Sequence, residues 1–255
     1  MGPPTTARFE NGSGPALDAS ALERIRSSFR GELVLPWDQR YESARRVWNG
    51  SIDKRPALIA RCSGVVVVVR AVEFAGEHDL LVAVRGGAHN VAGHATCDGG
   101  IVIDLSPLRG MSIDLARRII RVQAGATWGD VDHETQAFGL ATVGGLVSTT
   151  GVAGFTLGGG FGWLTRKYGL ACDSLMAAEI APPHAGFCER APSRTRICSG
   201  ACAGAEATSG SRPPSSSGSI PSGQSSPGAR SSSPPRRRAT CCASTATGSR
   251  TSPTS

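Results

Sequence analysis

The sequence predicts an α+β fold, and three observations carry this prediction. Apolar residues recur at helical and strand spacings in alternation from about residue 20 to residue 181. Within that stretch, residues 57–84 show the strand–helix–strand pattern of a βαβ unit. From residue 182 onward both kinds of periodicity end. We therefore expect one folded region followed by a segment of a different kind.

The first 30 residues are predicted to hold a polar leader and one helix. Ser20 and Glu23 match a capping box, in which two side chains satisfy free amides of a helix's first turn. Leu22, Ile25 and Phe29 then follow at helical spacing, which gives this helix one apolar face.

A short extended piece at 33–35 and a helical element at 41–48 lead into the βαβ unit. The helical element is defined by the spacing of Tyr41, Ala44, Val47 and Trp48. The unit consists of a strand at 57–62, a helix at 64–78 and a strand at 80–84. The valine run inside 64–78 favours a strand by propensity, but its apolar continuation makes it long enough to be a buried helix.

Four further elements complete the folded region. A strand is expected at 101–104, and an alternating pattern over 112–123 predicts a hairpin. Thr127 is suited to cap a helix that stops at Gly139. A last strand is predicted at 175–181.

The charge distribution argues against a nucleic-acid-binding domain. The chain has 27 Lys and Arg against 20 Asp and Glu, but nine arginines and only two glutamates fall in residues 182–255. Removing those leaves 18 basic and 18 acidic side chains in residues 1–181, so the folded region is neutral. Phe187 is the only aromatic residue in the tail, and no groove-reading helix accompanies the arginines, so we expect no nucleic-acid partner.

Neither a membrane nor a metal ion is expected as a partner. The N-terminus has no apolar signal segment, and no apolar run is long enough to span a bilayer. The eight cysteines lack the paired spacing of a zinc site or a disulfide framework, so we expect a cytoplasmic, reduced protein. His89 and His94 on a glycine-rich loop lack the helical spacing of a zinc pair.

A glycine-rich turn follows the apolar run 80–84. Its sequence is Arg85-Gly86-Gly87-Ala88-His89-Asn90. Glycines allow backbone N–H groups to approach a ligand without an intervening Cβ, and several such groups form a concave anion site. This pattern favours phosphate binding, with Arg85 as an added charge. The alternative is a plain turn between two strands with a solvated histidine.

A second glycine segment lies downstream. It contains Gly151, Gly154, Gly158, Gly159, Gly160 and Gly162, and it runs into Trp163-Leu164-Thr165-Arg166-Lys167-Tyr168-Gly169-Leu170. Three of its glycines imitate a dinucleotide fingerprint, but they follow no convincing strand and no acidic residue stands at the expected later position. We therefore reject a Rossmann domain.

The two glycine segments, in this order, resemble the FAD-linked oxidases of the vanillyl-alcohol-oxidase and p-cresol-methylhydroxylase (PCMH) superfamily, in particular the berberine-bridge-enzyme-like members. The resemblance extends from about residue 30 to 180. It implies a PCMH-type FAD-binding domain of two small α/β subdomains at 31–181. It also implies FAD as the cofactor, with the first loop on the pyrophosphate and the second segment on the flavin.

The resemblance also implies the residues of the cofactor site. His89 would bond covalently to the 8α-methyl of the flavin. Val147 stands where bicovalent relatives carry a cysteine, so a single linkage is expected. Ala88 replaces a usual glycine, and a positive φ there would cost about 1 kcal/mol. The predicted cofactor-binding residues are Arg85, Gly86, Gly87, Ala88, His89, Asn90, Val91, Gly93, Thr150, Gly151, Gly154, Gly158, Gly159, Gly160, Gly162, Leu164 and Ile180.

The function implied is that of an FAD-dependent oxidoreductase. The flavin would accept hydride from a small organic substrate, and O₂ would reoxidise it. In the family the substrate face and catalytic base come from later in the chain, so no base is assigned and this form is expected to be inactive. The alternatives are a non-catalytic flavin-binding fragment and nucleic-acid binding through the basic tail.

Residues 182–255 are predicted to be a disordered Ser/Pro/Arg-rich tail that arises from out-of-frame translation. The segment contains no Leu, Val, Met, Tyr or Trp, so it cannot bury enough apolar area to offset its ordering entropy. Read one frame over, with permitted wobble bases, residues 197–220 regain a Trp, a glycine-rich turn and a Phe-Glu-Phe strand that resemble the family's sequence at this point.

The frameshift predicts particular codons in the gene. Recovery of Phe-Trp requires TGT for Cys198 and TCT for Ser199, and recovery of Asn-Phe requires GCA for Ala207 and ACT for Thr208. A GC-rich gene would otherwise avoid these endings. Sequencing the gene past codon 180 tests this, and G or C at all four third positions would mean that the tail is genuine.

Overall fold

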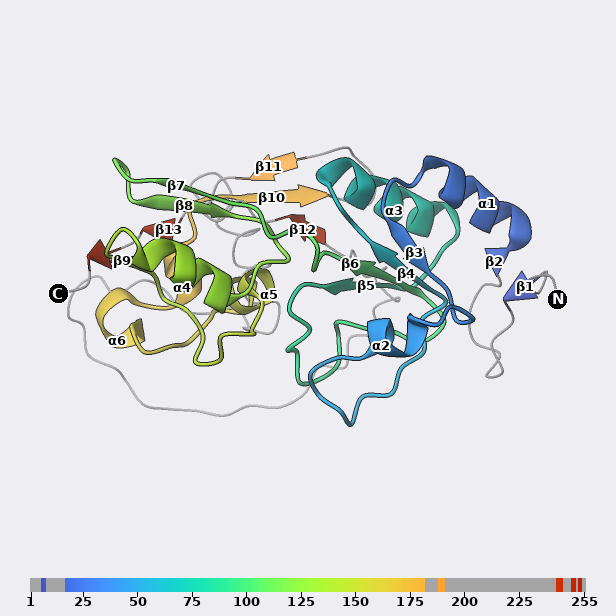
Figure 1. Cartoon of the computed structure of the whole chain (residues 1–255), viewed down its shortest axis with the longest axis horizontal. Coiled ribbons are helices and arrows are strands. Elements are labelled where there is room, and N and C mark those ends of the chain that lie inside the picture. Colours follow the sequence, from blue (N-terminus) through green and yellow to red (C-terminus); the bar gives the residue numbers. More distant parts are fainter. Residues whose placement is uncertain are drawn as a thin grey trace, which may run out of the picture.

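The computed structural model describes residues 6–7, 17–181, 188–190, 242–244, 249–250 and 252–253. Two groups of elements lie side by side (Figure 1). One is built on a four-stranded sheet of order β3-β4-β6-β5, and the other on the β7–β8 hairpin with α4 and α5. The α+β prediction is confirmed.

The element bounds are as follows. The helices are α1 Ala19–Ser28, α2 Tyr41–Arg45, α3 Val65–Glu77, α4 Trp128–Gln136, α5 Val152–Leu157 and α6 Thr165–Tyr168, with a 3₁₀ helix η1 at Ala171–Ser174. The strands up to residue 181 are β1 Thr6–Ala7, β2 Leu17–Asp18, β3 Glu32–Val34, β4 Leu58–Arg61, β5 Val82–Arg85, β6 Ile101–Asp104, β7 Met111–Asp114, β8 Ile119–Val122, β9 Leu140–Ala141 and β10 Ala178–Ala181.

The sheet of the first group is covered on both faces. Strands β4, β6 and β5 run parallel, and β3 pairs antiparallel with β4. One face packs against α1 and α3, through residues such as Val68, and the other packs Ile59 and Val102 against Tyr41 of α2. Because no face is left to solvent, all four residues of β6 are buried and the strand is apolar almost throughout.

The βαβ prediction is confirmed, with β6 inserted between its two strands. Helix α3 covers 65–77 where 64–78 was expected, which shows that the valine run is a buried helix. The crossover connects β4 to β5, but the later strand 101–104 pairs with both. A strand that enters from a distant segment leaves no trace in the local pattern, so only tertiary pairing reveals this order.

Two local predictions need correction, and two are confirmed. The cap of α1 is Asp18, whose carboxylate accepts a hydrogen bond from the Ala21 amide at 2.6 Å, and not Ser20. Helix α2 ends at Arg45, because Arg46 is already extended, so 46–48 lie outside it. The β7–β8 hairpin is confirmed, and Thr127 caps α4 in a capping box as expected.

Four short strands are described beyond residue 181. They are β11 Cys188–Arg190, β12 Cys242–Ser244, β13 Ser249–Arg250 and β14 Ser252–Pro253. They pair with β10, β8 and β9. The disordered tail over 182–255 stays a prediction. The remainder of the tail, including the frameshift test segment 197–220, lies outside the described residues.

Ile103 can be used to test how much the central strand β6 contributes to the stability of the fold. Its side chain is fully buried in β6 between β4 and β5, so we expect Ile103→Ala to lower the free energy of unfolding by about 2–5 kcal/mol. Urea denaturation followed by circular dichroism measures this. Val66→Ala, at a position of α3 that is 74% exposed, is the control and should stay close to the unmodified chain. Equal losses in both variants would contradict the described core.

Candidate functional site

Charged side chains gather at the carboxyl ends of the three parallel strands. Asp104, the last residue of β6, is the register partner of Arg61 at the end of β4 and of Arg85 at the end of β5. In open α/β sheets, ligands bind in the crevice outside the carboxyl ends of strands. The first glycine loop begins at this edge, directly after Arg85.

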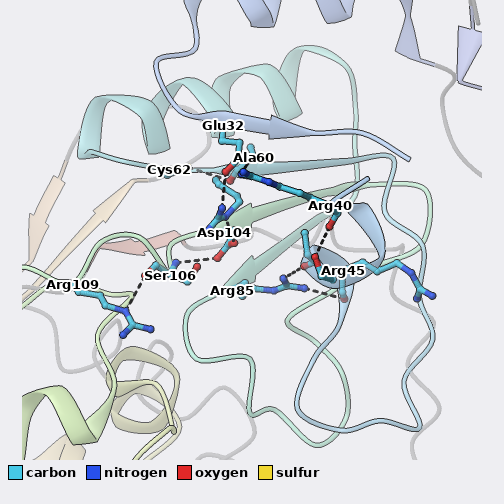
Figure 2. Close-up of polar contacts among 12 residues, drawn as sticks. Glu32, Arg40, Arg45, Ala60, Cys62, Arg85, Asp104, Ser106 and Arg109 are labelled. Atoms are coloured by element: carbon cyan, nitrogen blue, oxygen red, sulfur yellow. Dashed lines mark hydrogen bonds and ion pairs between the residues drawn. The ribbon is translucent and has the colours of Figure 1, made fainter. Parts of the chain in front are cut away.

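Arg85 does not stand free at the edge as the sequence suggested. Its side chain is 6% exposed and points at the end of α2 (Figure 2), where it donates hydrogen bonds to the carbonyls of Ala44 and Arg45. Burial lowers the pKa of the guanidinium. Its Nε is buried without a partner in the described part of the chain. Arg85 therefore ties the 41–48 segment to the sheet and leaves one donor unused.

A salt-bridge chain crosses the same edge. Arg61 bonds Glu32 at 2.6 Å and reaches the buried carboxylate of Asp104 at 3.3 Å. Arg40 bonds the other oxygen of Glu32 at 2.7 Å, and these two arginines hold the pKa of Glu32 below its usual value despite partial burial. Asp104 also accepts from the Ser106 amide at 3.0 Å. Figure 2 shows this chain running across the strand ends.

The two glycine segments meet backbone to backbone. A Cβ on Gly87 would lie 2.6 Å from the Gly151 Cα, closer than real Cβ atoms approach, and in a tight contact of 3.1 Å with the Thr149 carbonyl oxygen. A Cβ on Gly151 would in turn meet the Gly87 amide nitrogen. Glycine is therefore required at both positions, because only a bare Cα allows this approach. The contact joins segments about sixty residues apart.

Residues 87–89 have backbone amides that are unpaired within the described structure. The N–H groups of Gly87, Ala88 and His89 have no hydrogen-bond acceptor among the described residues. Ala88 has a φ of 58°, as expected from the sequence, which is a left-handed conformation that disfavours a side chain. Consecutive free amides in such a turn form a concave anion site.

His89 is held between the two glycine segments. Its Nε2 lies 2.9 Å from the Thr149 hydroxyl, and its Nδ1 lies 3.5 Å from the Thr150 hydroxyl. Trp48 stacks on the imidazole, with ring centroids 5.2 Å apart, and its amide donates to the Ala88 carbonyl. Partial burial lowers the pKa of His89, which favours the neutral ring. The ring is partly exposed and is contacted by Trp48, Thr149 and Thr150.

The rest of the first loop is shaped by its own contacts. The Asn90 side chain accepts from the His94 amide at 3.1 Å, and the Val91 carbonyl accepts from Asn49 at 2.8 Å. Gly93 has a φ of 72°, and a Cβ there would press on Ile52. These three predicted residues thus stabilise the turn.

The second segment forms a turn, a short helix and a second turn. Gly151 precedes α5, Gly154 lies within it and Gly158 ends it. Gly159 and Gly160 have φ values of 102° and 76°, and their carbonyls accept from the amides of Cys172 and Ala171. These glycines therefore allow the chain to turn at the two ends of α5.

Four further predicted residues lie in or near this segment. Gly162 lies against the Gly144 carbonyl, where a Cβ has no room. Leu164 precedes α6, and Ile180 is buried in β10. The Thr150 carbonyl accepts a hydrogen bond from the Trp128 amide, which connects the segment to α4.

A cavity of about 510 Å³ lies at the strand ends. Four predicted residues line it, namely Arg85, Gly86, Gly87 and Ala88, and the other predicted residues do not. The remaining lining residues are Val34, Arg40, Ser43, Ala44, Arg61, Asp104, Ser106, Arg109, Thr127 and Thr149. Four arginines line it, and three carboxylates pair with them, namely Asp104 in the lining and Glu32 and Asp130 beside it. The remaining excess of positive charge suits an anionic group.

Sequence reasoning missed most of these lining residues, Thr149 among them. The sequence does show that Arg61 and Asp104 each end an apolar run, which marks them as charged residues at strand ends. It does not show that the two strands pair in a register that brings these residues together. Thr149 stands directly before Thr150 and Gly151, and only the loop contact brings it to His89.

Within the described ranges, no group of three or more His, Cys, Asp or Glu side chains is arranged to hold a metal ion. No helix in that part of the chain is long and apolar enough to cross a bilayer.

Comparison with known proteins shows what this arrangement is. A family model described as "FAD binding domain" matches residues 56–185, just over half of the chain. The (R)-6-hydroxynicotine oxidase of Paenarthrobacter nicotinovorans is 40% identical over 153 residues, which are 60% of this chain and 33% of the relative. The FAD-linked oxidoreductase pgmH of Aspergillus terreus is 38% identical over 171 residues, which are 66% and 35%.

Solved structures agree with these matches. The crystal structure of 6-hydroxy-D-nicotine oxidase from Arthrobacter nicotinovorans superposes with a TM-score of 0.67 at 36% identity, covering 69% of this chain and 39% of that one. Berberine-bridge-enzyme-like protein 1 of Physcomitrella patens gives a TM-score of 0.68 at 24% identity, covering 72% and 40%, and supports the fold alone. The chain spans about one third of the length of the curated relatives it matches.

The fold and the paired glycine segments define a PCMH-type FAD-binding domain. The chain belongs to the FAD binding domain family, whose relatives here are FAD-linked oxidases and oxidoreductases. The predictions of FAD as the cofactor and of an oxidoreductase family are thereby confirmed.

Gly87 provides a test of the loop contact. We expect Gly87→Ala to lower the free energy of unfolding by about 1–3 kcal/mol, because its methyl group would press on the Gly151 backbone. Gly76→Ala in α3 is the matched control, since a Cβ there meets nothing within 4 Å and alanine is the better helix former. Chemical denaturation compares the two. A tolerated Gly87→Ala would show that the segments lie farther apart.

Proposed function

We propose that this chain binds FAD between its two glycine segments and links the flavin covalently to His89. The observation that carries this proposal is the backbone contact of Gly87 with Gly151, which sets His89 against the Thr149 hydroxyl beside the cavity. The matching family is an FAD binding domain, and the Aspergillus terreus relative is an FAD-linked oxidoreductase. The covalent linkage is our extension to this chain.

The residues present fit the diphosphate end of FAD. The free amides of 87–89 can donate to phosphate oxygens at close range, because the glycine keeps Cβ atoms away. Arg85 adds an unpaired Nε beneath the loop, and Arg40 and Arg109 line the same cavity. Positive charge around a polar cavity stabilises a dianionic group.

His89 is suited to bond the flavin. The lowered pKa keeps its imidazole neutral, so that one nitrogen retains a lone pair. Trp48 and Thr149 fix the plane of the ring. Val147, which is exposed at the second segment, supplies no thiol, so a single linkage is proposed.

FAD, when bound, supplies the capacity to accept a hydride, and the protein supplies binding and orientation. We propose a small organic molecule as the hydride donor and O₂ as the final acceptor. We assign no catalytic base within 17–181, so this form is proposed to hold the flavin without turnover. A non-catalytic flavin-binding fragment is therefore the second candidate, and hydrogen peroxide formation with an electron donor would separate the two.

The linkage can be tested by acid precipitation. After reconstitution with FAD, the flavin should remain with the denatured polypeptide, and His89→Ala should release it while native flavin absorbance persists. His94→Ala is the control, because His94 lies in the same loop and its contact to Asn90 is made by the backbone amide. Yellow precipitate from His89→Ala would place the bond elsewhere, and colourless precipitate from the unmodified chain would refute the linkage.

A further inference from the structure

We propose that Thr149 is the positioning residue for attachment of the flavin: its hydroxyl selects the reactive nitrogen of His89 and takes up the proton that this ring must lose. This inference rests on the proposed covalent link to His89. It concerns a residue that neither glycine motif contains.

The contact of Thr149 with His89 is set by backbone geometry. Gly87 and Gly151 touch through their main chains, and the Thr149 carbonyl lies against Gly87. The loop that carries Thr149 is also anchored to α4, because Gly129 donates to the Ser148 carbonyl at 2.8 Å. Two segments locked in this way present the hydroxyl at 2.9 Å from Nε2 with little freedom.

The two ring nitrogens are not equivalent in this setting. The Thr149 hydroxyl is in full hydrogen-bond range of Nε2, whereas the Thr150 hydroxyl is at the 3.5 Å limit from Nδ1. A hydroxyl can accept from a ring N–H or donate to a ring lone pair, and the proposal assigns the accepting role to Thr149. With Nε2–H donating to Thr149, the lone pair lies on Nδ1, which is the nucleophile.

The attachment step balances as follows. A bond forms from Nδ1 to the 8α carbon, one C–H bond of that methyl group breaks, and the Nε2–H proton is lost. Two electrons and two protons are thereby taken up by the flavin, and O₂, the acceptor already proposed, is reduced to hydrogen peroxide as it restores the oxidised cofactor. Thr149 is solvent-exposed, so its hydroxyl can pass the Nε2 proton on to water.

The experiment compares variants of the full chain after reconstitution with FAD in air. Thr149→Val keeps the shape but removes the hydroxyl, and Thr149→Ser restores it. Ser148→Ala removes the neighbouring hydroxyl, which makes no bond to His89 in the described structure. Total flavin is read from native absorbance, and bound flavin from fluorescence of the denatured polypeptide over time.

We expect Thr149→Val to bind FAD yet attach it about tenfold more slowly. Thr149→Ser and Ser148→Ala should behave as the unmodified chain. Attachment by Thr149→Val at the unmodified rate overturns the role of Thr149 while leaving the His89 linkage intact. Flavin that stays on His89→Ala overturns the linkage itself, so the two failures are distinct.

A measurement without flavin keeps the inference testable if a variant loads poorly. Long-range ¹H–¹⁵N correlation spectra of the FAD-free chain report which His89 nitrogen carries the proton. We expect the Nε2–H form in the unmodified chain and a mixture in Thr149→Val. Protonation on Nδ1 in the unmodified chain overturns the proposal.

Discussion

The contact between the Gly87 and Gly151 backbones is the constraint on which the site depends. It joins the loop after β5, at the edge of the parallel sheet, to the turn before α5 in the second group of elements. Neither position tolerates a Cβ, since each would strike the other's main chain. The free amides, the orientation of His89 and its bond to Thr149 all follow from this approach.

Support for that contact comes from both sides. On the sheet side, β6 is buried between β4 and β5, and Asp104 ends it between two arginines. On the other side, Trp128 of α4 packs edge to face against Phe155 of the second segment, and its amide donates to the Thr150 carbonyl. Packed layers give both loops rigid bases, which a site of precise geometry requires.

Arg85 illustrates how position changes the role of a charged residue. Beside a glycine loop, it suggested a phosphate ligand. In the fold it stabilises the end of α2 through two carbonyls and so fixes the segment that carries Trp48, which stacks on His89. Its Nε has no hydrogen-bond partner in the described part of the chain. A buried donor without a partner costs free energy, so a ligand that accepts from this Nε would be favoured.

The sequence by itself determined the elements and the two motifs. Strand and helix periodicity placed β4, α3, β5 and the β7–β8 hairpin, and the glycine segments indicated an FAD-binding domain, because these signals are local in the chain. The tertiary structure decided the pairing of β6, the burial of Arg85 and the meeting of His89 with Thr149. These depend on contacts between residues up to sixty positions apart, which no local pattern encodes.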